Sequence, residues 1–224
     1  MSEQPTGSPR AVAEASFTEV FGQALRGRPC RVLGLGDHAG HLPVDTWTRP
    51  ADAHDHALLD RCEGPTLDIG CGPGRMTAAL TERGVLALGI DVVAEAVDQT
   101  VERGGPALRR DVFDRLPGEG RWATALLADG NVGIGGDPIA LLRRARELLA
   151  PSGHVVVELA GPGVPARTSW AAIESGGARS RRFRWAVLGV DDIDAAAAGA
   201  GLRVVETARH GRRWVAVLAV QRAA

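Results

Sequence analysis

The stretch that most constrains this chain is TLDIGCGPGR at residues 66–75, where an apolar strand runs into closely spaced glycines. The following RMTAALTERG is typical of a helix, and VLALGID after it indicates a second strand that ends in Asp91. A strand, a glycine-rich turn and a helix in this order bring the backbone close to a bound nucleotide. Asp91 lies 21 residues after Gly70, at a strand end where a carboxylate can accept both ribose hydroxyls. The stretch therefore predicts a nucleotide site at the edge of a parallel sheet.

The spacing of the loop residues narrows the kind of nucleotide. The glycines follow the pattern G-x-G-x-G and are Gly70, Gly72 and Gly74. Arg75 stands where a dinucleotide fold needs a small residue, and Pro73 removes an N–H donor that a pyrophosphate would use. Asp68 puts a carboxylate near the loop, which repels phosphate and suits an ammonium group. We therefore expect a nucleoside joined to an amino acid, without phosphate.

A second glycine cluster lies upstream, in CRVLGLGDHAG at residues 30–40. It matches the dinucleotide pattern G-x-G-x-x-A through Gly34, Gly36 and Ala39. The segment that follows, HLPVDTWTRP, contains Pro43 and Pro50 and shows no helical face. Without a helix N-terminus there is no place to receive a pyrophosphate, so we interpret this cluster as a surface turn.

The rest of the chain alternates strand and helix, which predicts a mostly parallel sheet with helices on both faces. We expect strands at 66–70, 85–91, 107–112, 122–129 and 153–160, and helices at 74–83, 93–103, 137–149 and 191–199. Two apolar strands end the chain, GLRVVETA and RWVAVLAV, and only RHGR at 209–212 separates them. So short a link cannot make a parallel crossover, so these strands should form an antiparallel hairpin. The fold class is α/β, with a Rossmann-like seven-stranded sheet.

The N-terminal part carries different signals. Residues 1–15 are polar and indicate a disordered tail. Residues 16–63 predict a helical cap, or lid, with one helix that begins after Ser16 in a capping box with Glu19. A second helix would open at Pro50 and close at Gly64. The remaining residues, 64–224, should form the nucleotide-binding domain, with an insertion at 161–189 as a possible substrate lid.

These motifs resemble those of the class I S-adenosylmethionine-dependent methyltransferases. LDIGCGPGR is similar to their first motif, LGID to their second and RRDVFDRLP to their third, and ALLADGNVGIGGDP stands where the fourth lies. The resemblance covers about residues 64–224 and includes the terminal hairpin. It implies that S-adenosylmethionine binds and leaves as S-adenosylhomocysteine. The implied cofactor residues are Asp68, Gly70, Cys71, Gly72, Gly74, Arg75, Met76, Asp91, Val92, Asp111, Val112 and Asp129.

The acceptor side is less defined, because a methyl on a sulfonium is already activated and its transfer depends mainly on positioning. Asp129 and Asn131 follow the fourth strand and could orient an acceptor, or could cap the glycine-rich loop after it. DGN lacks the aromatic residue of the (D/N)PPY pattern, which argues against methylation of DNA adenine. His54 shares a helical stripe with Ala51, Leu58 and Cys62, so it should face either the core or the cofactor and is the candidate base.

Four further residues are candidates for contact with the acceptor. Trp47 and Arg49 precede the second helix and could cover the cofactor, or serve only packing and surface charge. Arg182 and Arg184 alternate with Phe183 and Trp185 in an expected two-stranded ribbon. They could hold a carboxylate or phosphate, or form a solvated edge.

Composition excludes several other classes. All 26 basic residues are Arg and Tyr is absent, so neither Schiff-base lysine chemistry nor a Tyr acid can operate. The net charge of −1 argues against a broad nucleic-acid interface, and the three cysteines have neither disulfide nor metal-site spacing. We expect a cytoplasmic methyltransferase with a small-molecule acceptor, no metal and no membrane segment. The alternatives are an NAD(P)-dependent oxidoreductase and a non-catalytic S-adenosylmethionine-binding regulator; the acceptor atom and the oligomeric state stay open.

Overall fold

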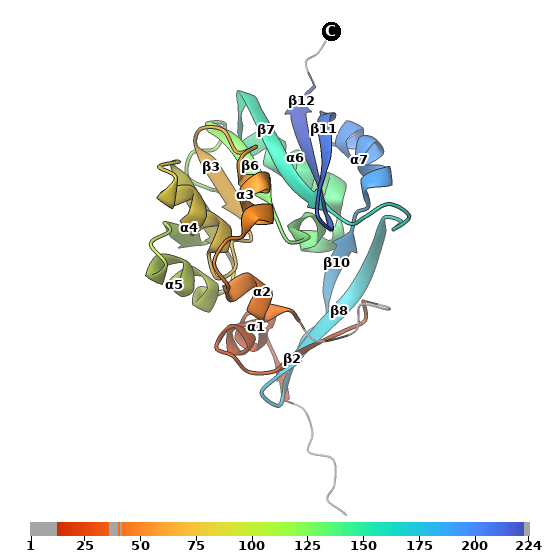
Figure 1. Cartoon of the computed structure of the whole chain (residues 1–224). Helices are drawn as coiled ribbons and strands as arrows, with labels where there is room; N and C mark the ends of the chain where they lie inside the picture. Colours follow the sequence, from red (N-terminus) through yellow and green to blue (C-terminus); the bar gives the residue numbers. More distant parts are fainter. Residues whose placement is uncertain (1–12, 36–39, 41, 222–224) are drawn as a thin grey trace, which may run out of the picture.

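The computed structural model describes residues 13–35, 40 and 42–221. Its main layer is a seven-stranded sheet in the order β11-β12-β7-β6-β3-β4-β5 (Figure 1). The sheet is parallel except for β12, which runs antiparallel to both β7 and β11. The predicted α/β class, seven-stranded sheet and terminal hairpin are therefore confirmed. The strands are β3 (Thr66–Ile69), β4 (Ala87–Asp91), β5 (Ala107–Arg109), β6 (Trp122–Leu127), β7 (Leu149–Leu159), β11 (Leu202–His210) and β12 (Arg213–Val220).

Helices cover both faces of this sheet because its central strands are apolar on both sides. Ala125 and Leu127 of β6 pack in one cluster with α6 and α7, while Leu126 between them packs with α3 and α4 on the opposite face. Asp137 caps α6, where Pro138 occupies the first turn, as expected for a helix start. The helices are α3 (Ala53–Leu59), α4 (Arg75–Glu82), α5 (Ala94–Glu102), α6 (Pro138–Leu148) and α7 (Ile193–Gly199), with 3₁₀ turns η2 (Asn131–Gly136) and η3 (Val190–Asp192).

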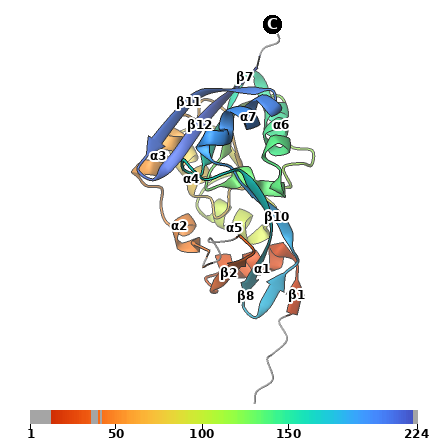
Figure 2. The same cartoon turned by 90° about the vertical axis from the view of Figure 1, so that its right-hand side faces the viewer.

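A second, five-stranded sheet joins the N-terminal segment to the expected insertion. β8 (Arg167–Ser175) pairs with β9 (Ala178–Ser180) and β10 (Phe183–Val187), and also with β2 (Cys30–Leu33). β1 (Ala13–Ala15) pairs with β9 in parallel. Figure 2 shows this sheet together with α1 (Phe17–Leu25) below the main sheet. The N-terminal segment and the insertion thus form one unit, which we call the second lobe; it comprises residues 13–48 and 167–187 where described.

Several expectations for the N-terminal region need correction. Residues 13–15, expected in a tail, form β1, and the remainder of that tail lies outside the described residues. The capping box at Ser16 and Glu19 is confirmed. The cap is not all helical, since β2 pairs with β8 of the insertion. The segment between Pro43 and Pro50, expected without a helix, contains the short helix α2 (Val44–Thr48).

The upstream glycine cluster lies in a chain reversal beside β2. Val32 N–H donates to Gly40 O and Leu42 N–H to Cys30 O, so the chain folds back on this strand as a turn would. Gly34 has φ +87°, while Gly36 and Ala39 lie outside the described residues. This is the local geometry of the expected turn.

The second lobe is fixed to the main domain through α1 and α5. Phe17 and Phe21 of α1 pack against Val93 and Ala96. Arg26 forms an ion pair with Glu95 at 2.5 Å, and Gln99 Nε2 donates to Leu25 O at 3.1 Å. The contacts lie beside the carboxyl ends of β3 and β4, so they hold the second lobe over that edge of the main sheet. None of the described helices is long and apolar enough to cross a membrane.

Candidate functional site

A cavity of about 570 Å³ lies between the carboxyl edge of the main sheet and the second lobe. This volume is in the range of small-molecule sites. On the sheet side, its walls come from the loops after β3, β4, β5 and β6. The chain leaves β3 for β4 on one side and returns to β6 on the other, so the cavity lies where ligands bind in open α/β sheets. The sheet-side residues include Gly70, Cys71, Gly72, Pro73, Arg75, Met76, Asp91, Val92, Asp111, Val112, Asp129 and Asn131.

The glycine loop is held in its path by contacts on both sides. Gly70 has φ +73°, and Asn131 Nδ2 donates to the carbonyl oxygens of Ile69 and Gly70 at 2.9 and 2.8 Å. Gly74 has φ +85°, and a Cβ there would lie 2.6 Å from Thr100 of α5. Both positions therefore require glycine. These contacts hold the loop backbone in place, and its Gly72 lines the cavity.

Asp91 lies at the end of β4, and its carboxylate oxygens can accept further hydrogen bonds. Its two carboxylate oxygens accept one N–H each, from Val93 at 2.9 Å and from Gly72 at 3.0 Å. Burial raises the pKa of Asp91, and these N–H groups partly offset that effect. Because each oxygen keeps a free lone pair and the residue lines the cavity, Asp91 can accept two adjacent hydroxyls.

Asp111 and Val112 line the cavity after β5. Asp111 is exposed and its Oδ1 accepts the Phe113 N–H at 3.0 Å, while Val112 is buried. A carboxylate next to an apolar side chain can recognise a flat base through its edge and its face. The structure thus puts the expected ribose and adenine residues on neighbouring loops of the same cavity.

Asp68 and Gly74 are the two predicted cofactor residues that do not line the cavity. Asp68 is buried beneath the glycine loop and accepts a hydrogen bond from Thr77 Oγ1 at 2.6 Å. Burial raises the pKa of its carboxyl to about 7, although the Thr77 hydroxyl opposes that shift. Asp68 does not line the cavity and supports the loop from behind, so its expected contact with an ammonium group stays a prediction.

A buried network of charges lies next to the loop. Arg75 donates to Asp55 and, at 2.5 Å, to Asp129; Arg213 of β12 bonds Asp55 and, at 2.6 Å, Glu158. Asp55 has no exposed side-chain surface. Its burial would raise its pKa, but the Asp52 N–H and the guanidinium groups hold it well below its usual range. The network ties α3, α4, β7 and β12 together.

Asp129 is the acidic member of this network that lines the cavity, where Arg75 also lies. It is the one described non-glycine residue with positive φ, at 51°, a conformation that costs about 1–3 kcal/mol and is typical of functional sites. Its N–H donates to Glu158 Oε2 at 2.7 Å, while Arg75 holds its carboxylate. Burial raises the pKa of Asp129, and Arg75 opposes the shift. This carboxylate is therefore fixed at the cavity wall.

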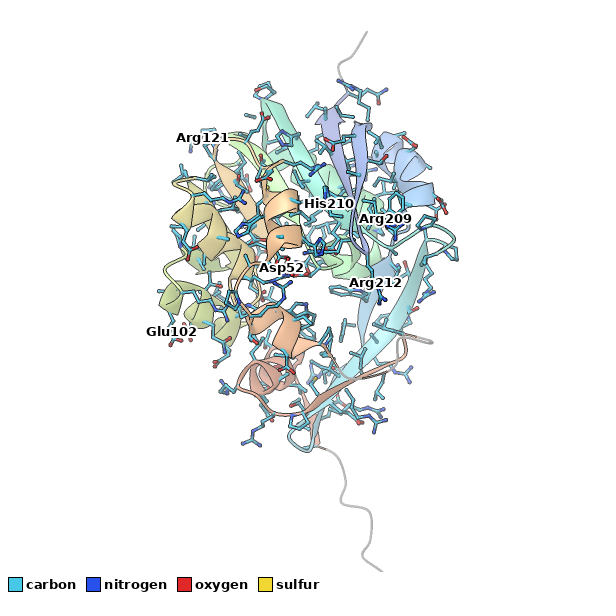
Figure 3. The ribbon with its side chains drawn as sticks, viewed as in Figure 1. Asp52, Glu102, Arg121, Arg209, His210 and Arg212 are labelled. Carbon is cyan, nitrogen blue, oxygen red and sulfur yellow. The ribbon has the colours of Figure 1, made fainter. Side chains whose placement is uncertain are left out.

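His54 does not face inward. It is exposed, does not line the cavity, and lies against the β11–β12 turn, where a Cβ on Gly211 would be 2.8 Å from its ring. The reason is the start of the helix: Asp52 is the N-cap, and the inward face carries Asp55 and Leu58. Figure 3 shows Asp52 at this helix end, facing the hairpin tip that carries Arg212. Of the expected stripe, Ala51, Leu58 and Cys62 do pack in the core, and only His54 does not.

The four expected acceptor residues separate into two groups. Trp47 and Arg184 line the cavity. Arg49 instead pairs with Asp55 at 2.6 Å and Asp52 at 3.0 Å, as part of the charge network. Arg182 lies outside the cavity, in a groove on the second sheet beside Trp170. Asn131 lines the cavity, and its amide bonds the carbonyl of Gly70 in the loop after β3 rather than the glycine-rich loop that follows Asn131, so the expected cap of that later loop is not found.

Sequence reasoning missed most of the wall opposite the glycine loop. It includes Phe17 and Phe21 of α1, Val32 of β2, Ile173 of β8, and Phe183 and Trp185 of β10. The apolar face of the first helix was visible in the sequence, but no local pattern tells that it meets residues some 150 positions later in the chain.

Comparison with known proteins agrees with this geometry. Residues 46–207 match the model of a methyltransferase domain family. The chain belongs to this methyltransferase family, which confirms the expected resemblance. A search of curated protein sequences finds no match.

Solved structures show the same fold at low identity. A methyltransferase from Bacteroides fragilis in complex with S-adenosylhomocysteine has a TM-score of 0.76 and 20% identity, over 91% of this chain and 93% of that one. A sugar N-methyltransferase from Streptoalloteichus has a TM-score of 0.59 and 17% identity, over 99% and 100%. A 1,6-didemethyltoxoflavin N1-methyltransferase from Burkholderia thailandensis has a TM-score of 0.58 and 20% identity, over 80% of this chain and 82% of that one.

Proposed function

We propose that this protein transfers a methyl group from S-adenosylmethionine to a small-molecule acceptor. The observation that carries the proposal is the arrangement of one cavity. Its sheet-side wall offers a glycine loop, the Asp91 carboxylate and the pair Asp111 and Val112 in the order that an amino acid, a ribose and an adenine would need. Similar structures contain S-adenosylhomocysteine, which supports this choice of cofactor.

The residues also argue against a pyrophosphate ligand. Asp91, Asp111 and Asp129 line the sheet-side wall together with Arg75 and Arg110, so carboxylates outnumber cations there and disfavour a phosphate. Arg75, the cation nearest the loop, is already paired with Asp55 and Asp129. A cationic sulfonium and an ammonium group suit this electrostatic environment, whereas the two phosphates of NAD do not.

Bound S-adenosylmethionine supplies a methyl group that a sulfonium already activates, so the protein has to position the acceptor. Arg75 and the Glu158 contact hold Asp129 at the cavity wall, where its carboxylate can orient the acceptor and take up its proton. Trp47, Arg184 and the other cavity-lining residues of the second lobe would exclude water from the transfer.

Isothermal titration with S-adenosylhomocysteine, NAD and NADP tests the cofactor. We expect S-adenosylhomocysteine to bind with NAD and NADP silent, and binding of NAD instead would overturn the proposal. Transfer of a labelled methyl group from S-adenosylmethionine to a panel of metabolites then separates an enzyme from a binding protein. An enzyme incorporates label into an acceptor, whereas a regulator binds the cofactor and transfers nothing.

A further inference from the structure

The aromatic residues of this protein gather in one place. The chain contains four Phe, five Trp and no Tyr. All four Phe and two of the Trp line the cavity. These six side chains come from α1, α2, β10 and the loop after β5, which are remote in sequence. A concentration of most of the aromatic content at one site needs an explanation beyond general packing. The residues are Phe17, Phe21, Trp47, Phe113, Phe183 and Trp185.

Five of these rings form a continuous series, which we call the ring wall: Trp47, Phe21, Phe17, Phe183 and Trp185. Phe17 stacks on Phe21 with centroids 5.3 Å apart, and meets Phe183 edge to face at 4.8 Å. Trp47 extends the series beside Phe21 at 6.0 Å, and Trp185 extends it beside Phe183 at 6.5 Å. Among the described residues, every close aromatic pair belongs to this series.

The ring wall is not a sealed core. Its neighbours Val20, Ala24 and Ile173 are at most 1% exposed, as expected for residues that only fill space. Each ring of the wall keeps partial exposure and lines the cavity. Trp122, an aromatic residue elsewhere, is 8% exposed and its indole N–H is bonded to Pro117 O. The rings of the wall therefore present surface that is free to contact a ligand.

Charge is scarce on this side of the cavity. Of the cavity-lining residues that the described part of the second lobe contributes, Arg184 alone is charged. The side chain of Arg184 is exposed and its Nη2 lies 3.4 Å from Gly136 O. A sugar or a polyanion needs many polar partners, which this wall does not offer. Flat aromatic ligands gain from stacked and edge-to-face contacts with rings.

We propose that the acceptor is a flat, aromatic small molecule that lies against the ring wall with a nucleophilic oxygen or nitrogen toward Asp129. The inference rests on the proposed function. A lone pair of this atom bonds to the methyl carbon, the carbon–sulfur electron pair returns to sulfur, and the acceptor's proton goes to Asp129 or solvent. Arg184 lines the cavity from β10, the strand that also carries Phe183 and Trp185, and its guanidinium suits one polar substituent on the acceptor.

The test uses three probes on the full chain saturated with S-adenosylhomocysteine. 2-Naphthol is flat and aromatic, decahydro-2-naphthol has nearly the same size without the rings' π-face, and glucosamine is polar. We expect 2-naphthol to bind about tenfold more tightly than its saturated counterpart and glucosamine not to bind, as measured by titration calorimetry. Equal affinity for the two naphthols, or preferential binding of glucosamine, would overturn the inference.

Variants then locate the effect. Phe183→Leu removes a ring that contacts both Phe17 and Trp185, so the preference for 2-naphthol should fall about three- to tenfold. Trp47→Phe keeps a ring and should retain the preference. Trp170→Leu, an exposed aromatic residue of β8 outside the cavity, is the matched control and should change nothing. An unchanged preference in Phe183→Leu would contradict the ring wall as the binding surface.

The two proposals can fail separately. S-adenosylhomocysteine binding by each variant reports an intact sheet side, and its absence in the natural protein would count against the proposed function. In that case the naphthol pair is titrated into the unliganded protein, where the affinity ratio still decides for or against the ring wall. If S-adenosylhomocysteine binds and the two naphthols have equal affinity, the cofactor assignment stands and the acceptor class is wrong.

Discussion

The two walls of the cavity are built in different ways. The sheet-side wall consists of short loops after parallel strands, and its glycine loop, helix start and Asp91 lie within 26 residues of sequence. The ring wall combines α1 and α2 with β10, which lies more than 130 residues later. The first wall carries the carboxylates of the cavity and is fixed by backbone geometry, and the second is apolar and fixed by side-chain packing. A family can therefore keep its cofactor site and still vary its acceptor by changing the second lobe.

The most severe test of this division removes the three N-terminal rings of the ring wall, Trp47, Phe21 and Phe17. Deletion of residues 1–49 takes away β1, α1, β2 and α2, so β8 loses its pairing with β2 and the cavity loses the N-terminal part of one wall. We expect methyl transfer to be abolished and S-adenosylhomocysteine binding to weaken. Deletion of residues 1–12, which keeps β1, should be harmless. Arg31→Pro, at the neighbouring β2 position that is paired with Glu174, interrupts the β2–β8 pairing within the full chain and should resemble the large deletion. A large deletion that stays folded and fully active would contradict the role of this wall.

Asp129 lines the cavity that both walls enclose, and we expect its replacement to affect chemistry more than cofactor binding. Asp129→Asn keeps the size but cannot accept a proton, and we expect turnover to fall about a hundredfold or more with cofactor affinity changed only a few-fold. Turnover of the natural protein should rise with pH as this carboxyl, whose pKa is raised by burial, loses its proton. His54→Ala, on the exposed side of α3, is the control and should retain turnover. Equal turnover of Asp129→Asn and the natural protein would exclude Asp129 from the reaction.

Asp91 tests the sheet-side wall alone. Asp91→Ala leaves the ribose hydroxyls without a charged acceptor, which costs about 1.5–3 kcal/mol or roughly ten- to a hundredfold in S-adenosylhomocysteine affinity. The 2-naphthol preference should not change, because the ring wall is intact. A folded Asp91→Ala protein with unchanged cofactor affinity would refute the ribose assignment.

The smallest expected effect concerns Asp68 behind the glycine loop. Its pKa of about 7 in the folded protein exceeds the ordinary value of 3.8, so the folded state binds a proton more readily than the unfolded chain. Stability should therefore fall as pH rises from about 4 to 7 and level off above 7. Asp68→Asn removes the charge, and its melting temperature at pH 8 should exceed that of the natural protein by about 3–6 °C. If the melting temperatures of the two proteins change with pH in the same way, ionisation of Asp68 does not lower the stability of the natural protein.

The difference between the locally built sheet-side wall and the ring wall, which joins distant segments, explains what the sequence could predict. Strand and helix periodicity, the spacing of Gly70, Gly74 and Asp91, and the short link before Arg213 are local signals, and each led to a correct feature of the main sheet. The β2–β8 pairing joins segments about 140 residues apart, for which no local pattern exists. The error at His54 arose because Asp52, rather than Pro50, begins the helix and turns Asp55 inward. Arg49 was misassigned because its partner Asp55 was not expected to be buried.

The most direct test of the two-wall description is a crystal structure with S-adenosylhomocysteine bound. We predict the ribose on Asp91, the adenine between Asp111 and Val112, and the sulfur facing Asp129 with the ring wall beyond it. Placement of the adenine against the ring wall, or a sulfur that faces away from Asp129, would contradict it.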